Sequence, residues 1–167
     1  MQGRPSPVRL PRLRLRKKKW DDQPTQGAAV LIASSGDVVP RAAVRWAVSM
    51  SDGEPVAVIS LARIYGSSFG LPNPGLMPTK KELETQRTQV TKTLGLIEKA
   101  GHEGWGQVAA TRRPVKTIVA AARARGVRHV LVIAPEAPRW REIVEGNLMK
   151  DVARRLGAGV HVEGMAP

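Results

Sequence analysis

The sequence predicts an α/β domain, a doubly wound five-stranded parallel sheet with helices on both faces. Short apolar runs without polar–apolar alternation occur at residues 28–34, 55–62 and 129–134, which is typical of strands buried on both faces. Segments with apolar residues at helical spacing lie between them. Strands that alternate with helices indicate parallel pairing through right-handed crossovers.

The first half of the predicted domain opens with the strand AAVLIAS at residues 28–34, after which SGD turns the chain. A helix is expected over residues 39–50, where apolar side chains recur every three or four positions. PVAVISLA at 55–62 is the second strand. The segment at 63–78 is rich in Gly, Pro and Ser and is expected to be a long loop.

The next elements include the most clearly marked helix, over residues 79–101. Thr79 is a candidate N-cap, and Glu82 stands three residues later, as in a capping box. A third strand is expected at 105–111. The helix that follows, 114–126, begins with proline and ends with glycine, an arrangement that helix termini favour.

The last three elements are a strand at 129–134, a helix at 140–157 and a strand at 158–164. This connectivity predicts the strand order 3-2-1-4-5. Ligands of such sheets bind outside the carboxyl ends of the strands, where the order reverses. Here that position lies between the loops SSGD, after the first strand, and PEAPRW, after the fourth.

Residues 1–27 differ from the rest and are expected to form an extended basic arm outside the domain, which spans residues 28–167. The chain carries a net charge of +13, and eight cations precede its first acid, which leaves +5 for the remainder. Three prolines among these cations oppose a helix. The predicted nucleic-acid contacts of the arm are Arg4, Arg9, Arg12, Arg14, Arg16, Lys17, Lys18, Lys19 and Trp20.

Such a concentration of charge indicates an anionic partner. RNA or a ribonucleoprotein such as the ribosome is predicted, because an extended cationic chain can order on a phosphate-rich surface. Arg112 and Arg113, directly before an expected helix, are added to the predicted contacts. A membrane is the less favoured partner, with Leu10, Leu13 and Leu15 as its only apolar contacts in the arm.

Composition excludes several classes of protein. The chain has no cysteine, so disulfides, thiolate catalysis and Cys-ligated metals are excluded. No apolar run approaches the roughly 20 residues of a membrane span. The apolar segment of a secretory signal does not follow the basic start. We therefore expect a cytoplasmic protein.

The residue types of catalytic and metal sites occur without the required spacing. His102, His129 and His161 are the three histidines, and they share no metal-ligand pattern, so no metal is expected. Ser34 and Ser35 lack the G-x-S-x-G surroundings of a nucleophile elbow. No catalytic residue is assigned, and the protein is expected not to be an enzyme.

The pattern of the whole domain, over about residues 28–164, resembles a universal stress protein domain. The segments that carry this resemblance are AAVLIASSGDVVPRAAVRWAVSM, PVAVISL, PVKTIVAAARARGVRHVLVIA and EGNLMKDVARRLGAGVHV. The resemblance implies the five-stranded fold above and a homodimer formed through the last strand. It also implies that the protein falls among either the ATP-binding or the non-binding members.

The ATP-binding members have an Asp after the first strand, and Gly-x-x-Gly followed by Gly-Ser/Thr after the fourth. Glycines there let backbone N–H groups approach phosphates. In this chain the Asp position holds Ser35, and Ala134 and Ala137 replace the first two glycines beside prolines, which have no N–H. We expect nucleotide to bind weakly or not at all. If ATP binds, the resemblance places it at Ser35, Gly36, Gly146 and Asn147.

The sequence thus predicts a non-enzymatic, stress-protein-like binding protein whose basic arm contacts RNA or a ribonucleoprotein. Two alternatives stay open. One is an ATP-binding, dimeric universal stress protein, and the other is a peripheral subunit of a membrane complex.

Overall fold

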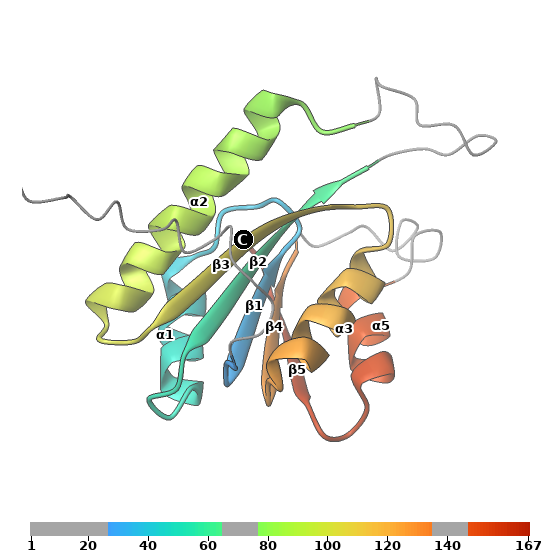
Figure 1. The fold of residues 1–167 in the computed structure, drawn as a ribbon. Coiled ribbons are helices and arrows are strands. Elements are labelled where there is room, and N and C mark those ends of the chain that lie inside the picture. Colours follow the sequence, from blue (N-terminus) through green and yellow to red (C-terminus); the bar gives the residue numbers. More distant parts are fainter. Residues whose placement is uncertain (1–26, 65–76, 135–146) are drawn as a thin grey trace, which may run out of the picture.

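A computed structural model describes residues 27–64, 77–134 and 147–167 of the chain. The described residues form a five-stranded sheet with the order β3-β2-β1-β4-β5, in which every pairing is parallel (Figure 1). The predicted fold class and strand order are confirmed. The strands are β1 (Val30–Ser34), β2 (Val56–Arg63), β3 (Gly104–Thr111), β4 (His129–Ile133) and β5 (His161–Met165).

Helices cover both faces of the sheet (Figure 1). On one face α1 (Arg41–Met50) and α2 (Lys80–Lys99) pack over a core that includes Val30 and Ile32. On the other face α3 (Pro114–Arg125) and α5 (Leu148–Leu156) pack over a core that includes Leu31 and Ala33. Successive β1 residues therefore enter opposite cores, which explains why the strand shows no polar alternation.

The predicted capping box at the start of α2 is confirmed. The Thr79 hydroxyl accepts a hydrogen bond from the Glu82 backbone N–H at 3.2 Å, and the Glu82 carboxylate accepts one from the Thr79 N–H at 2.6 Å. These bonds, first to the Thr79 backbone and then to its side chain, hold the pKa of Glu82 below its ordinary value. The box fixes where α2 begins, and so which of its side chains face the sheet.

Two predicted boundaries are wrong. The helix expected over 140–157 is interrupted at Asn147, which is extended (φ −96°, ψ 108°) and acts as the N-cap of α5, so that α5 begins at Leu148; residues 140–146 lie outside the described residues. The last strand begins at His161 rather than at 158. Gly157 takes a positive φ of +77°, and the next three residues form a turn before β5.

Other predicted segments lie outside the described residues. These are residues 1–26 of the arm, most of the loop expected at 63–78, and residues 135–146 before α5.

Close packing of α2 on β3 depends on the absence of a side chain at Gly106. A Cβ there would lie 2.5 Å from Val90 Cγ1 and 2.8 Å from Leu94 Cδ1. Val90 is β-branched and on a helix, so it has little freedom to move away. We predict that Gly106→Ala lowers the free energy of unfolding by about 1–3 kcal/mol in urea denaturation.

Gly95, on the α2 helix that packs against β3, provides a control glycine with open space around it. A Cβ at Gly95 meets nothing within 4 Å. Gly95→Ala should raise the free energy of unfolding by about 0.5–1 kcal/mol, because alanine loses less backbone entropy in a helix. Equal stability of the two variants would contradict the packing described for β3.

Candidate functional site

The candidate site is the point where the strand order reverses, at the carboxyl ends of β1 and β4. The last residue of β1, Ser34, is in register with Ile133, the last residue of β4. The Ser35 backbone N–H donates to the Ile133 carbonyl at 3.1 Å. The loop after β1 is thus tied directly to the end of β4, as the predicted site requires.

Two serines organise this loop around Asp37. The Ser34 hydroxyl donates to the Asp37 carbonyl at 2.6 Å, and the Ser35 hydroxyl donates to the Asp37 carboxylate at 3.1 Å. Ser35 and Asp37 are both half-buried. Ser35, which stands where the ATP-binding family members have Asp, therefore lies beside a carboxylate supplied two residues later. Sequence reasoning treated Asp37 as a turn residue and missed it.

Gly36, between these residues, has a φ of +98°, a conformation that side chains rarely adopt. A Cβ at Gly36 would lie 3.0 Å from Gln86 Nε2. The α2 helix therefore brings the Gln86 amide to the same edge of the sheet, where its oxygen accepts a hydrogen bond from the Ser60 hydroxyl at 3.3 Å. Ser60 is in register with Ser34 on the neighbouring strand β2. Neither Gln86 nor Ser60 was singled out from the sequence.

The β4 side of the site is only partly described. The Ala134 N–H, at the position of the first family glycine, donates to the Met165 carbonyl at 3.2 Å and is thereby engaged within the sheet. Gly146 lies outside the described residues, as do Ala137 and the two prolines beside the alanines. The described groups of the site are three serine hydroxyls, the Gln86 amide and the Asp37 carboxylate.

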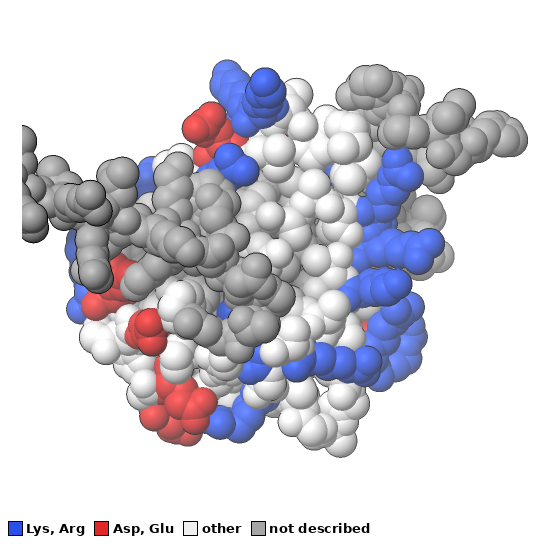
Figure 2. Space-filling model, in the orientation of Figure 1, with Lys and Arg blue, Asp and Glu red and all other residues white. Residues whose placement is uncertain are grey.

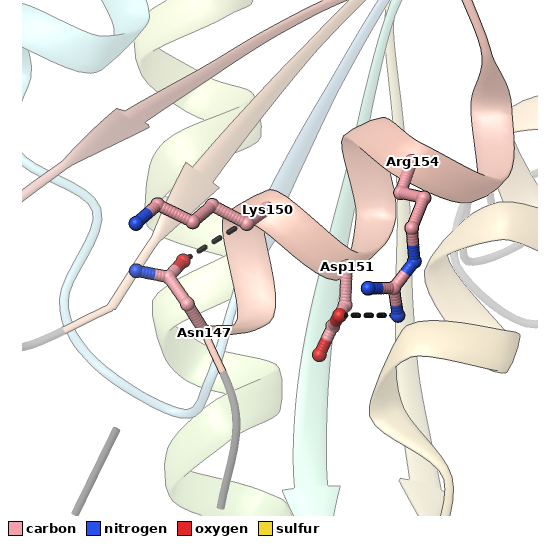
Figure 3. A network of polar contacts seen from close by, with 4 residues as sticks. All are labelled: Asn147, Lys150, Asp151 and Arg154. Carbon is pink, nitrogen blue, oxygen red and sulfur yellow. Dashed lines mark hydrogen bonds and ion pairs between the residues drawn. The ribbon is translucent and has the colours of Figure 1, made fainter. Parts of the chain in front are cut away.

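Asn147, the last predicted nucleotide residue, has a structural role (Figure 3). Its side-chain oxygen accepts a hydrogen bond from the Lys150 backbone N–H at 3.1 Å and caps α5. One turn further along, Arg154 forms an ion pair with Asp151 at 2.7 Å. Asparagine is among the residues that helix N-caps favour, so the side chain of Asn147 stabilises the first turn of α5.

The predicted basic residues at the other end of this edge are exposed. Arg112 and Arg113 follow β3, and the Arg113 backbone N–H donates to the Thr111 hydroxyl at 2.9 Å. One strand, β2, lies between β3, which they follow, and β1, which the Ser35 loop follows. The predicted contacts of the arm, from Arg4 to Trp20, lie outside the described residues.

The histidines lie away from the point where the strand order reverses. His102 Nδ1 is 3.1 Å from the hydroxyl of Ser51, which is fully buried and donates to the Val48 carbonyl, so this contact joins the ends of two helices. The rings of His129 and His161 lie 5.9 Å apart. Within the described ranges, no three His, Asp or Glu side chains are grouped to hold a metal ion.

Neither a protein-family model nor a curated protein matches the chain, but solved structures do. The universal stress protein from Archaeoglobus fulgidus in complex with dAMP matches with a TM-score of 0.55 and 19% identity, over 83% of this chain and 96% of that one. A structure of universal stress protein from the same organism gives 0.55 and 14%, over 84% and 93%. A universal stress protein family member from Burkholderia pseudomallei gives 0.54 and 10%, over 83% and 96%.

These likenesses confirm the predicted universal-stress-protein fold. At such identities they establish the fold alone.

We predict that Asn147→Ala lowers the free energy of unfolding by about 1 kcal/mol, because the first turn of α5 loses its side-chain acceptor. Asn147→Ser, which restores the hydroxyl of the family pattern, should be close to the unmodified protein. Urea denaturation of the two variants measures the difference. Equal losses of unfolding free energy in the Ala and Ser variants would show that the side-chain acceptor at the N-cap contributes nothing to stability.

Proposed function

We propose that the chain is a non-enzymatic, cytoplasmic binding protein built on the universal-stress-protein fold, and that its basic arm contacts RNA or a ribonucleoprotein such as the ribosome. The observation that carries this proposal is the position of the charge. Eight of the 27 Lys and Arg residues lie in the first 19 residues, where no Asp or Glu occurs.

Counterion release makes such an arm suited to nucleic acid. A cation that neutralises a phosphate frees a condensed counterion, and this gain in entropy favours the binding of a densely charged arm. The interaction is with the backbone and needs no particular base sequence. Trp20, at the end of the basic run, has an aromatic ring of the kind that stacks on unpaired bases.

The arm prediction is tested with two variants of equal net charge. Changing Arg12, Arg14 and Arg16 to Gln should make the slope of log affinity against log salt shallower by about 2–3, since each lost duplex contact removes about 0.9. Changing Lys80, Lys81 and Lys92 on α2 removes the same charge from exposed positions and should change the slope by less than about 1.

The measurement is a salt titration of RNA-duplex binding by fluorescence anisotropy, with circular dichroism as the folding control. Equal slopes for the two variants would remove the arm from the RNA contact.

A nucleotide-binding dimer is the second candidate function. It is favoured by the Ser35–Asp37 loop, which lies where doubly wound sheets bind ligands, and by the dAMP complex of the similar Archaeoglobus fulgidus protein. In this candidate ATP lies against Ser35 and Gly36, and two copies pair through β5. Our first proposal instead expects no cofactor.

Calorimetry with ATP and magnesium, and with dAMP, separates the two candidates. The first proposal predicts dissociation constants weaker than the micromolar range. Micromolar or tighter binding that Gly36→Val abolishes would favour the second candidate. Gly53→Val is the matched control, since Gly53 also has a positive φ (+82°) but lies in open space. Sedimentation with and without ATP reports the dimer.

A peripheral subunit of a membrane complex is the remaining alternative. No helix in the described ranges has both the length and the apolar character needed to cross a bilayer. Binding of the chain to anionic lipid vesicles tests this alternative.

A further inference from the structure

A second concentration of positive charge lies on the folded domain, over α3 and α5. Figure 2 shows Lys and Arg gathered along the side of the molecule that these helices form, while most of the visible Asp and Glu lie on the opposite side. The exposed cations of this surface, here called the α3–α5 basic face, are Arg112, Arg113, Lys116, Arg123, Lys150, Arg154 and Arg155.

The α3 part of the face is a regular ridge. Arg113, Lys116 and Arg123 follow one another at spacings of three and seven residues, which place them on one side of the helix. Ile118, Val119 and Ala122 occupy the buried side. From Arg113 to Arg123 the ridge is about 15 Å long, which matches roughly four phosphates along one strand of a duplex.

The two helices are held together as one surface. The Arg123 guanidinium donates to the Arg155 carbonyl at 2.7 Å, near the ends of both helices. Asp151 is the one acid in the described part of this layer, and its ion pair with Arg154 leaves that arginine side chain 75% exposed. Lys150 and Arg155 are also exposed.

The α2 helix on the other face has a different composition. Its Lys and Arg residues are interspersed with Glu82, Glu84 and Glu98, so its surface carries charges of both signs. Arg128, beyond the end of α3, is paired with Glu54 at 3.2 Å. The positive surface over α3 and α5 is therefore a local feature of one layer and does not follow from the net charge alone.

The arm joins the domain beside this face. The Ala28 backbone N–H, directly after the arm, donates to the carbonyl of Arg125, the last residue of α3, at 3.1 Å. Lys19 precedes Gly27 by eight residues, which span at most about 28 Å. The last cations of the arm can therefore reach a ligand that also lies along α3, itself about 18 Å long.

We propose that the α3–α5 basic face binds the sugar–phosphate backbone of the same duplex RNA that the arm contacts. This inference rests on the proposed function and adds a rigid, folded contact to it. Five of the seven cations are arginines, whose forked guanidinium matches phosphate oxygens. Neither α3 nor α5 contains an aromatic residue, so the face has no platform for bases and binds without sequence preference.

RNA fits this face better than a lipid surface does. The exposed large apolar side chains of the described residues are Val38 and Met77, and both lie outside α3 and α5. The exposed apolar positions of α3 are alanines. A helix that binds a bilayer needs large apolar side chains next to its cations.

The test uses the full-length chain and three variants that each lose three positive charges. In the face variant Arg112, Arg113 and Lys116 become Gln. These side chains are exposed and form no hydrogen bond or ion pair within the described residues, so folding should be unaffected. The arm variant changes Arg12, Arg14 and Arg16, and the control changes Lys80, Lys81 and Lys92. The affinity of each protein for two 20-base-pair RNA duplexes of unrelated sequence is measured over a range of salt concentrations.

We expect the face variant to weaken binding of both duplexes equally, by about tenfold or more near 100 mM salt. Its salt slope should be shallower by about 2–3. The control should change the slope by less than about 1. If every variant unfolds at the same temperature as the unmodified protein, the fold is intact in all of them.

The outcomes separate the two proposals. If the face variant behaves like the control while the arm variant loses affinity, the basic face is not a contact and the arm proposal stands. If the arm variant behaves like the control while the face variant loses affinity, the arm proposal fails and the face remains. No binding of either duplex by the unmodified chain at 50 mM salt overturns both. Binding to phosphatidylglycerol vesicles that the face substitutions weaken, with RNA binding unchanged, assigns the face to lipid instead.

Discussion

The burial of β1 is the constraint on which the rest of the structure depends. All five of its residues are buried, and its backbone pairs with β2 on one edge and β4 on the other. The chain builds outward from β1 to β3 and then returns to the other edge for β4 and β5. The reversal of strand order beside Ser34, and the placement of α3 and α5 together on one face, both follow from this arrangement.

Much of the fold could be predicted because a strand buried on both faces leaves a plain apolar run, as in VLIAS and HVLVI. The start of α5 could not, because the segment before Asn147 keeps helical spacing. The signal for a boundary was the asparagine itself, a residue that favours the N-cap. Apolar periodicity outweighed that local signal, and the predicted helix was extended to residue 140.

The candidate site was predicted less completely than the fold. Its position followed from topology, and Ser35 and Gly36 were found in the loop after β1. Gln86 could not be found, because a polar residue on a helix reaches Gly36 and Ser60 only once α2 is packed across β2. The basic face has the same origin. Arg113 and Arg155 are 42 positions apart in the sequence, and only the packing of α3 against α5 places them on one surface.

The two ends of α3 connect regions that the sheet otherwise separates. The helix begins after Thr111, at the carboxyl edge of the sheet, and ends at Arg125, whose carbonyl binds the Ala28 N–H at the amino edge. Burial lowers the pKa of Arg125 from its ordinary value, yet an arginine keeps its charge throughout the physiological range. The positive ridge thus runs from the carboxyl edge of the sheet, where the Ser35 loop lies, to the amino edge, where the arm joins the domain. A phosphate backbone laid along α3 would be held at fixed spacing by the helix, and the arm, which joins the domain beside Arg125, would add further cations to it. In such an arrangement the rigid part reduces the entropy that binding must overcome, because engagement of the arm becomes an intramolecular step.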